Sequence, residues 1–388
     1  MSDSLTILMP CLNEENTIAI CIQKALKFYE RNNINGEILV VDNGSDDNSV
    51  NIVRSYSPSV NLISIEQKGY GNALIAGINN AKGNWIIMGD SDDTYDFNDL
   101  EKFVTSLQQG YDVILGNRFK GKIEKYAMPF LHRYIGNPVL SFFGRLFFKV
   151  RIGDFHCGLR AGKKSKLQDL NLVCGGMEFA TEMVAKAALN KLSITEVPVN
   201  LSADKRAGAS HLRTWIDGWR HLRFMLLYSP AWLFLYPGIF LFISFGILTI
   251  VLFISPVQIG QIVFDVHTML YCGLGVMIGF QFILFYIFTK TYVTTHALMP
   301  PLKSFEKLYN FFNLERGLLA GLLIFIIGLL IAFFSFKDWQ HTGFGHLNTS
   351  VTLRKVIPSF ILILTGLQII FSSFFLSILG IKRKNEVS

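Results

Sequence analysis

The sequence predicts an α/β domain with a mostly parallel, Rossmann-like sheet, followed by interfacial helices and a four-helix transmembrane region. Two observations predict this order. Over residues 1–200, short apolar runs alternate with helical segments, as in strands joined by crossover helices. From Trp232 onward, four apolar blocks follow one another, each of about 20 residues, the length that crosses a hydrocarbon core.

The expected elements of the N-terminal half follow in order. Strands are predicted at 5–9, 37–41, 61–65, 85–88 and 112–115, and helices at 15–32, 48–55, 71–81 and 98–109. The run 196–199 is predicted as a final edge strand, because Pro198 has no amide hydrogen to donate to a further strand. Ligands of such open sheets bind at the carboxyl ends of the strands.

Two carboxylates at the end of an apolar run are the strongest chemical signal. Asp90 and Asp92 follow the strand at 85–88, and residues i and i+2 of an extended chain lie on one side. Mg2+ and Mn2+ prefer carboxylate and phosphate oxygens, so the pair suits a metal ion bound against a diphosphate. An acidic turn that caps the next helix explains the tripeptide alone about equally well.

Further polar clusters follow the other strands. Glu14 follows the first strand, and Asp42 follows the second, where a carboxylate suits a nucleobase or ribose but a capping turn is the simpler explanation. Lys68-Gly-Tyr-Gly71 could bring one cation and a close backbone to a phosphate, although it fits neither a dinucleotide fingerprint nor a phosphate-binding loop. Clusters at three strand ends together predict one polar site.

The C-terminal half is predicted to span a membrane. The apolar blocks cover 232–254, 269–289, 317–336 and 356–381. The loop 255–268 has no Lys or Arg, whereas basic residues occur at 303–316 and 382–384, which favours both termini and the N-terminal domain in the cytoplasm. Basic residues at 337 and 354–355 make this bias moderate. No signal peptide is expected, because the chain opens with a polar turn and a strand.

A basic, Trp-bearing segment precedes the first span. Residues 212–227 place apolar and basic side chains near helical spacing, which predicts an amphipathic helix at the membrane surface. The net charge of +7 therefore points to a membrane rather than to nucleic acid. The predicted boundaries are 1–208 for the cytosolic domain, 209–230 for this helix and 231–388 for the spans. A second amphipathic segment is expected at 302–312.

Cysteine usage indicates a reducing compartment. The chain has five cysteines and no Cys-x-x-Cys pair, which argues against a disulfide framework and against a zinc site.

An ordered set of motifs carries a family resemblance. The motifs are Pro10-Cys-Leu-Asn-Glu-Glu15, Val41-Asp-Asn-Gly-Ser-Asp46, Lys68-Gly-Tyr-Gly71, Asp90-Ser-Asp92 and Gly116-Asn-Arg118. This set resembles the inverting GT-A glycosyltransferases, and among them the polyprenyl-phosphate (dolichol-phosphate) hexose synthases of multi-span type. The resemblance covers about residues 5–215. It implies a GT-A fold, a nucleotide-sugar donor, a polyprenyl-phosphate acceptor and Mg2+ or Mn2+ as cofactor.

The resemblance also implies roles for single residues. Asp90 and Asp92 would bind the metal ion and the diphosphate, and Arg118 would complete the catalytic set. The implied substrate contacts are Pro10, Leu12, Glu14, Asp42, Lys68, Ser91, Asp93, Thr94, Arg133, Arg206 and His211. Asn43, Thr94 and His211 stand where the family often has an acid, Gln and Lys, which leaves the donor base and the acceptor contacts open.

The segment 153–160 is expected at the same site, with Glu178 and Glu182. Asp154 and Arg160 are expected to pair and to shape the pocket, although a buried ion pair without a chemical role is equally consistent.

The leading hypothesis is inverting transfer of a hexose to polyprenyl phosphate at the cytoplasmic membrane face. UDP-glucose is the favoured donor and GDP-mannose the alternative. A processive polysaccharide synthase would need a Gln-x-x-Arg-Trp element near the interfacial helix, and the sequence has none. A non-catalytic membrane scaffold fits poorly with the intact acidic pair, and few charges lie within the spans. The oligomeric state, including a homo-oligomer, stays open.

Overall fold

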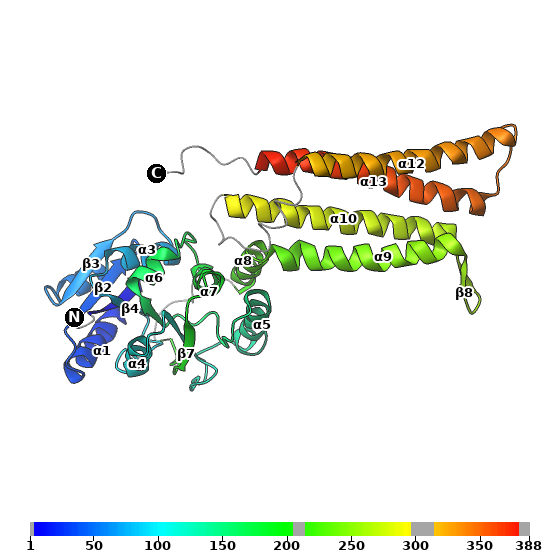
Figure 1. Ribbon diagram of the computed structural model, residues 1–388. Helices are drawn as coiled ribbons and strands as arrows, with labels where there is room; N and C mark the ends of the chain where they lie inside the picture. Colours follow the sequence, from blue (N-terminus) through cyan, green and yellow to red (C-terminus); the bar gives the residue numbers. More distant parts are fainter. Residues whose placement is uncertain (1–3, 205–213, 296–313, 380–388) are drawn as a thin grey trace. The chain divides into compact units, whose positions relative to one another are not determined.

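The computed structural model describes residues 4–204, 214–295 and 314–379 (Figure 1). The chain forms two compact units, Met1–Tyr228 and Ser229–Ser388. The predicted boundary near residue 208 lies in the segment 205–213, outside the described residues, and stays a prediction.

A seven-stranded sheet forms the centre of the N-terminal unit, in the order β3-β2-β1-β4-β6-β5-β7. Its strands are β1 (Leu5–Cys11), β2 (Glu37–Asp42), β3 (Val60–Ser64), β4 (Trp85–Met88), β5 (Val113–Asn117), β6 (Arg160–Lys163) and β7 (Ile194–Pro198). Neighbouring strands are parallel except at β6, which pairs antiparallel with both β4 and β5. Pro198 ends the edge strand β7, as predicted.

Helices cover both faces of this sheet (Figure 1). They are α1 (Ile18–Arg31), α2 (Ser49–Arg54), α3 (Tyr70–Asn80), α4 (Glu101–Gln108), α5 (Asn137–Phe148) after the π-helical turn η1 (His132–Gly136), α6 (Lys164–Asp169), α7 (Phe179–Leu189) and α8 (Thr214–Leu227). Each face has its own apolar core, because successive side chains of a strand point to opposite sides. Ile7 and Met9 pack in one core and Leu8 in the other, so β1 reads as a continuous apolar run.

The C-terminal unit contains four helices that are long and apolar enough to cross a membrane. They are η2 with α9 (Ala231–Ile254), α10 (Val266–Thr295), α12 (Leu314–His341) and α13 (Thr349–Leu379). Each of the last three exceeds its predicted apolar block at its N-terminal end. The segment between α9 and α10 forms a hairpin of β8 (Val257–Ile259) and β9 (Ile262–Phe264), where the sequence predicts only a loop. The amphipathic segment predicted at 302–312 lies outside the described residues.

Glycines allow the helices of this unit to approach closely. A Cβ built on Gly279 of α10 would lie 2.5 Å from the backbone nitrogen of Phe242 in α9. A Cβ on Gly366 of α13 would lie 2.6 Å from the backbone nitrogen of Phe325 in α12. Contacts between small residues are a principal source of helix association in lipid, where the hydrophobic effect is weak.

Two polar connections reach α13 from the segments around α10. Gln368 Nε2 donates to Gln281 Oε1 at 3.1 Å, midway along both helices. Arg354 pairs with Asp265, which precedes α10, and also donates to the carbonyl of Leu252.

We expect Gly366→Val to destabilise the C-terminal unit, because the new side chain meets backbone atoms that cannot move independently. Overpacking of this kind typically costs about 1–3 kcal/mol. Gly246→Val in α9 is the control, since a Cβ there meets no atom within 4 Å. The measurement is the thermal unfolding midpoint of the full chain in detergent. Equal midpoints for the two variants would contradict the described packing.

Candidate active site

The loops after β1, β2 and β4 meet at one edge of the sheet. Cys11 and Asp42 are partners in the register of β1 and β2, so both loops start at the same level. Asn13 Oδ1 accepts a hydrogen bond from the backbone of Asp46 at 2.8 Å, and Ser91 Oγ donates to the carbonyl of Pro10 at 2.7 Å. The structure thus brings together the polar clusters that the sequence places at three strand ends.

The first two loops are tied together by buried polar side chains. The backbone of Glu14 donates to Ser49 Oγ at 2.8 Å, and Thr17 Oγ1 donates to Glu14 Oε2 at 2.9 Å. The Asp42 carboxylate accepts from the backbone nitrogens of Gly44 and Ser45 and closes a tight turn. Pro10, Glu14 and Asp42 are buried, and Leu12 is half-buried beside them. Asp42 therefore caps a turn at the candidate nucleoside site, so its two explanations are compatible.

Defined donors orient the acidic pair. Tyr70 donates from its hydroxyl to Asp90 Oδ1 at 2.8 Å. Thr94 donates to Asp92 Oδ1 from its backbone nitrogen at 3.1 Å and from its hydroxyl at 2.6 Å. Gly158 lies directly against the other oxygen of Asp90, since a Cβ there would be 2.1 Å from Oδ2. Tyr70 and Gly158 are site residues that the sequence analysis does not single out.

The chemistry of this pair fits a hard divalent cation that arrives with its substrate. Within 4–204, 214–295 and 314–379, no group of three or more His, Cys, Asp or Glu side chains could hold a metal ion. Mg2+ is usually bound through one or two carboxylates plus substrate phosphates. Asp90 and Asp92 would supply these carboxylates, with the remaining ligands from a diphosphate and water.

Asp93 is committed to a different contact. Its backbone has a φ of 60°, and its buried carboxylate pairs with Lys24 Nζ of α1 at 2.8 Å. The carboxylate of Asp93 therefore contacts α1, whereas those of Asp90 and Asp92 form the acidic pair.

The glycines of Lys68-Gly-Tyr-Gly71 serve a close backbone approach. The backbone of Gly71 donates to the carbonyl of Gly175 at 2.9 Å, and a Cβ on Gly71 would lie 2.0 Å from the carbonyl oxygen of Cys174. Gly69 donates from its backbone to Asn43 Oδ1 at 2.7 Å. Lys68 Nζ lies 3.5 Å from the carbonyl of Gly44, so the one cation of this segment sits over the loop after β2.

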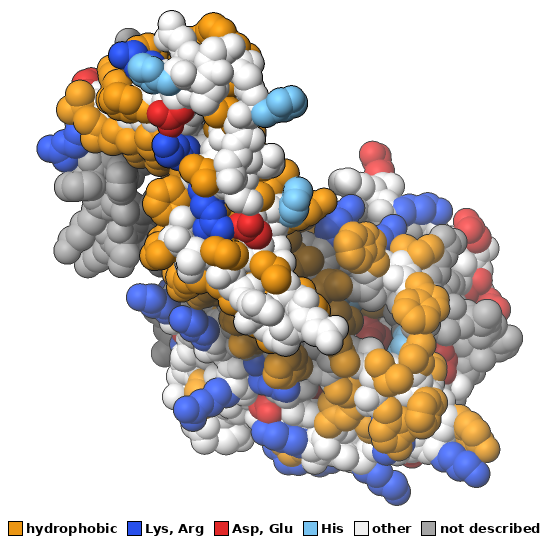
Figure 2. All heavy atoms as spheres, turned by 90° about the vertical axis from the view of Figure 1, so that its right-hand side faces the viewer, with side chains coloured by type: hydrophobic (Ala, Val, Ile, Leu, Met, Phe, Trp, Pro, Cys, Tyr) orange, Lys and Arg blue, Asp and Glu red, His pale blue; other side chains and the backbone are white. Residues whose placement is uncertain are grey.

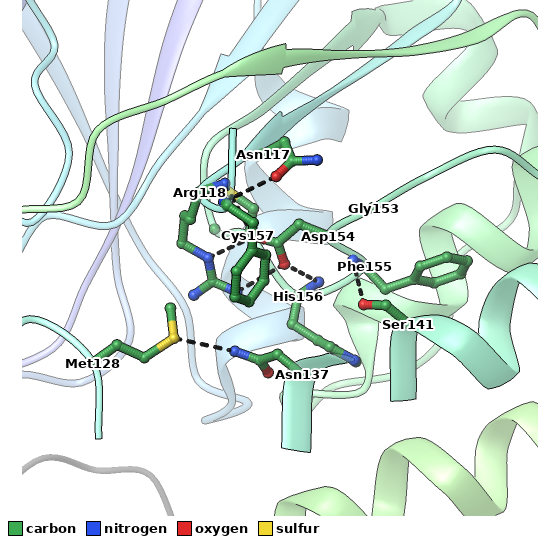
Figure 3. A network of polar contacts seen from close by, with 12 residues as sticks. Asn117, Arg118, Met128, Asn137, Ser141, Gly153, Asp154, Phe155, His156 and Cys157 are labelled. Atoms are coloured by element: carbon green, nitrogen blue, oxygen red, sulfur yellow. Dashed lines mark hydrogen bonds and ion pairs between the residues drawn. The ribbon is translucent and has the colours of Figure 1, made fainter. Parts of the chain in front are cut away.

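The expected pairing of Asp154 with Arg160 is wrong. Asp154 binds Arg118 instead, through a two-pronged ion pair of 2.7 Å to Nε and 2.8 Å to Nη2 (Figure 3). Arg160 is 2 % exposed and donates to three backbone carbonyls, those of Phe155, Cys157 and Ala180. Asp154 follows the helix α5 and comes back beside the end of β5, which the sequence pattern does not indicate.

Of the other predicted substrate contacts, Arg133 is described by the structure and Arg206 and His211 are not. Arg133 is half-buried in η1, with its guanidinium 5.4 Å from the ring centre of Tyr134. Arg206 and His211 lie outside the described residues. Glu182 accepts from the backbones of Val173 and Cys174 and pairs with Lys186 at 2.8 Å, a structural role within α7.

Two histidines are buried near Arg118. The rings of His156 and His221 meet edge to face, with centres 4.5 Å apart. His221 Nδ1 lies 2.8 Å from Thr181 Oγ1. Burial lowers the pKa of His221 from 6.5 to about 4, against the opposing effect of Asp217. The sequence analysis includes His156 in the segment 153–160 and His221 in the basic segment 212–227, but it does not predict that the two rings meet, because isolated histidines give no spacing pattern.

Comparison with known proteins identifies the class. The profile of glycosyl transferase family 2 matches residues 6–170, and the profile of the C-terminal transmembrane region of the same family matches 287–380. A low-salt glycan biosynthesis hexosyltransferase, Agl6 of Haloferax volcanii, is 34 % identical over 382 residues, which cover 98 % of this chain and 90 % of that protein. The chain belongs to glycosyltransferase family 2 and is an integral membrane enzyme of that family.

Two further relatives show how far the similarity extends. A dolichyl-phosphate hexose transferase of Haloferax volcanii is 29 % identical over 216 residues, which cover 56 % of this chain and 90 % of that protein. The crystal structure of glucosyl-3-phosphoglycerate synthase from Mycobacterium tuberculosis covers 59 % of this chain and 80 % of its own at 15 % identity and a TM-score of 0.45. A structural likeness of that size bears on neither the substrate nor the metal of this chain.

We expect the N-terminal unit to lose stability as the pH falls from about 6.5 towards 4. In this window the unfolded chain binds a proton on His221 that the folded chain does not bind, so acid favours unfolding. His221→Phe should reduce the loss, and the exposed His267→Gln should not. Thermal midpoints of the full chain in detergent between pH 7 and pH 5 provide the measurement. The same pH slope in His221→Phe and wild type would show that His221 is not the titrating group.

Proposed function

We propose that this enzyme transfers a hexose from a nucleotide sugar to a polyprenyl phosphate at the cytoplasmic membrane face, with inversion at the sugar. The observation that carries the proposal is the oriented pair Asp90 and Asp92 at a sheet edge, in a chain with four helices of membrane-spanning length. The similarity to a dolichyl-phosphate hexose transferase supports the acceptor.

The donor site is proposed at the loops after β1 and β2. Pro10, Leu12 and Glu14 would contact the nucleoside, and Asp42 would accept hydrogen bonds from the base or ribose. UDP-glucose is the favoured donor and GDP-mannose the alternative, and Asn43, which stands where the family often has an acid, leaves the base of the donor open. Lys68, Ser91 and Thr94 complete the proposed contacts.

A metal ion at Asp90 and Asp92, Mg2+ or Mn2+, would supply Lewis-acid stabilisation of the diphosphate leaving group. Tyr70 and Thr94 hold the two carboxylates in place before the substrate binds, which lowers the cost of ordering them during the reaction. Gly158 leaves room for the carboxylate of Asp90, because any larger residue there would displace it.

The acceptor phosphate is proposed to act as the nucleophile without a general base. A phosphate monoester has lost its first proton at pH 7, and its second pKa is about 6. A phosphate oxygen bonds to C1 of the hexose, and the bond from C1 to the diphosphate oxygen breaks, so no proton has to be removed. Arg118, Arg133 and Arg206 are proposed to offset the repulsion between the two phosphates. Because this mechanism needs no general base, it leaves Asp93 available for its ion pair with Lys24.

Exposed aromatic side chains support a membrane-facing position for the acceptor site. Trp215 and Trp219 of α8 are 81 % and 58 % exposed, and Phe130 and Tyr134 beside η1 are 72 % and 57 % exposed. On the surface shown in Figure 2, hydrophobic side chains gather in patches with Lys and Arg close by. Aromatic rings flanked by cations are typical of surfaces that lie at the headgroup level. We propose that α8 lies on the cytoplasmic leaflet and that both termini are cytoplasmic.

The proposal is tested by incubating the purified chain with radiolabelled UDP-glucose or GDP-mannose and extracted polyprenyl phosphates, with and without EDTA. The expected result is a labelled lipid from one donor that EDTA prevents. A labelled polymer without a lipid would favour a polysaccharide synthase. The absence of transfer from either donor, with Mg2+ or Mn2+ present, would contradict both proposed donors or the lipid acceptor.

We expect Asp92→Asn to lose at least about a hundredfold in turnover, because one charged ligand of the metal is removed while the fold is kept. The exposed Asp96→Asn, four residues further along, is the matched control. Initial rates are measured over a range of Mg2+ concentrations. Wild-type turnover of folded Asp92→Asn at ordinary Mg2+ would exclude the metal site.

We expect Arg133→Ala to raise KM for the lipid about tenfold and to leave KM for the nucleotide sugar unchanged. Loss of one charge-assisted hydrogen bond to phosphate accounts for this size. Lys125→Ala is the control, because Lys125 is an exposed cation a few residues away. Equal lipid KM values in Arg133→Ala and wild type would place the phosphate elsewhere.

A further inference from the structure

A cavity of about 140 Å³ lies next to the Arg118–Asp154 pair. Its walls come from separate parts of the N-terminal unit, and its lining includes Arg118, Leu140, His156, Met177, Asp217 and His221. The last two belong to α8, the helix proposed to lie on the membrane. The cavity therefore joins the strand ends to that helix within one folded unit.

His156 is the least satisfied polar side chain of this cavity. The side chain is half-buried, but both of its ring nitrogens are buried, and neither has a hydrogen-bond partner in the described part of the chain. A buried polar atom without a partner typically costs about 1–3 kcal/mol. An unpartnered ring that lines a cavity is explained when a ligand supplies the missing bonds.

The chain connects this cavity to the acidic pair over a short segment. His156 lines the cavity, and two residues further on a Cβ built on Gly158 would lie 2.1 Å from Oδ2 of Asp90. The hexose of a nucleotide sugar is bonded through C1 to the diphosphate. Its ring must therefore lie within a few ångströms of the group that Asp90 and Asp92 would hold.

We propose that this cavity receives the hexosyl ring of the donor, and that His156 hydrogen-bonds its hydroxyl groups. The inference rests on the proposed function, because it needs a nucleotide-sugar donor. It adds the part of the site that selects the sugar, with His156, Asp217 and His221 as specificity-determining residues.

The chemistry of the walls suits hydroxyl groups better than a phosphate. Burial, and next the neighbouring His221, lower the pKa of His156 well below 6.5, so its ring is neutral at pH 7. A neutral imidazole offers one donor and one acceptor, which a hydroxyl group can satisfy together. The carboxylate of Asp217 accepts from a hydroxyl but repels an anion. Leu140 and Met177 suit the C–H faces of a sugar ring.

Arg118 contributes a hydrogen-bond donor to the lining of this cavity. Asp154 binds its Nε and Nη2, and the third guanidinium nitrogen points away from Asp154 (Figure 3). This nitrogen can therefore donate to a hydroxyl group of the hexose, while Asp154 fixes the guanidinium beside the two phosphates.

The test compares binding of UDP-glucose and UDP to the full chain in detergent with Mg2+, by calorimetry, with GDP-mannose and GDP in parallel. His156→Leu should weaken binding of the sugar nucleotide about tenfold, roughly the loss of two neutral hydrogen bonds, and leave binding of the free nucleotide unchanged. His156→Asn keeps a donor and an acceptor and should recover part of the loss. Gly218→Val is a second variant, because Gly218 lines the cavity and a Cβ there meets no atom within 4 Å.

Each outcome decides the assignment. If His156→Leu weakens binding of UDP-glucose and of UDP equally, the role of His156 is structural. If it weakens binding of neither, the hexose does not bind in this cavity. Both results overturn the inference. A variant that leaves binding of both nucleotides unchanged and changes only KM for the extracted polyprenyl phosphate would assign the cavity to the acceptor and also overturn the inference. If the wild type binds UDP-glucose through His156 but transfers nothing to lipid, the proposed function fails while the hexose cavity stands.

Discussion

The ion pair between Arg118 and Asp154 is the interaction on which the site depends. Asp154 also accepts from the backbones of Arg118 and His156, so one buried carboxylate fixes the start of the loop that leads to β6. Gly158, four residues after Asp154 in the same loop, lies against the carboxylate of Asp90. Removing one partner of a buried pair typically costs about 3–5 kcal/mol. A substitution of Asp154 would therefore disturb the acidic pair, Arg118 and the cavity together.

Arg160 fastens the other end of the same loop. Two of its hydrogen bonds go to carbonyls of the loop, those of Phe155 and Cys157, and the third goes to Ala180 of α7. These three bonds explain how an arginine can be buried in a sheet strand. The guanidinium fork can serve several fixed acceptors at once, which a lysine cannot. The loop is thus held at Asp154 by charge and at Arg160 by backbone polarity.

The fold was predictable where local patterns decide the structure. β4 was predicted at its observed bounds, and β1, β2 and β5 within two residues, because buried parallel strands read as apolar runs between polar turns. β6 was not predicted, since Arg-Ala-Gly-Lys has two charges and no alternation. The buried Arg160 of this strand is satisfied in part by the carbonyl of Ala180, 20 residues away, which the local sequence does not indicate. Helices α5 and α7 were also not predicted, because much of their apolar surface faces partners that only the tertiary fold supplies.

The same distinction between local patterns and tertiary contacts holds for the residues of the site. The sequence identifies Asp90 and Asp92 because their spacing along a strand end is itself the geometry. It could not identify Tyr70 or Gly158 as their neighbours, since those contacts join segments 20 residues or more apart. The partner of Asp154 was predicted wrongly for the same reason. Arg160 lies six residues from Asp154 in the sequence, whereas Arg118 lies 36 residues away and only the tertiary fold brings it beside Asp154.

The two polar connections of the C-terminal unit have a consequence for how its helices can move. Asp265 and Gln281 are 16 positions apart, about 24 Å along a helix at 1.5 Å per residue. Arg354 and Gln368 meet them at matching heights on α13. Sliding α13 by one turn would break both contacts together, whereas a substitution at either level leaves the other to hold the alignment. The register of α13 against α10 is therefore fixed at two levels, and the bond from Ser350 to Asp265 together with the packing of Gly273 against Ile361 adds to it.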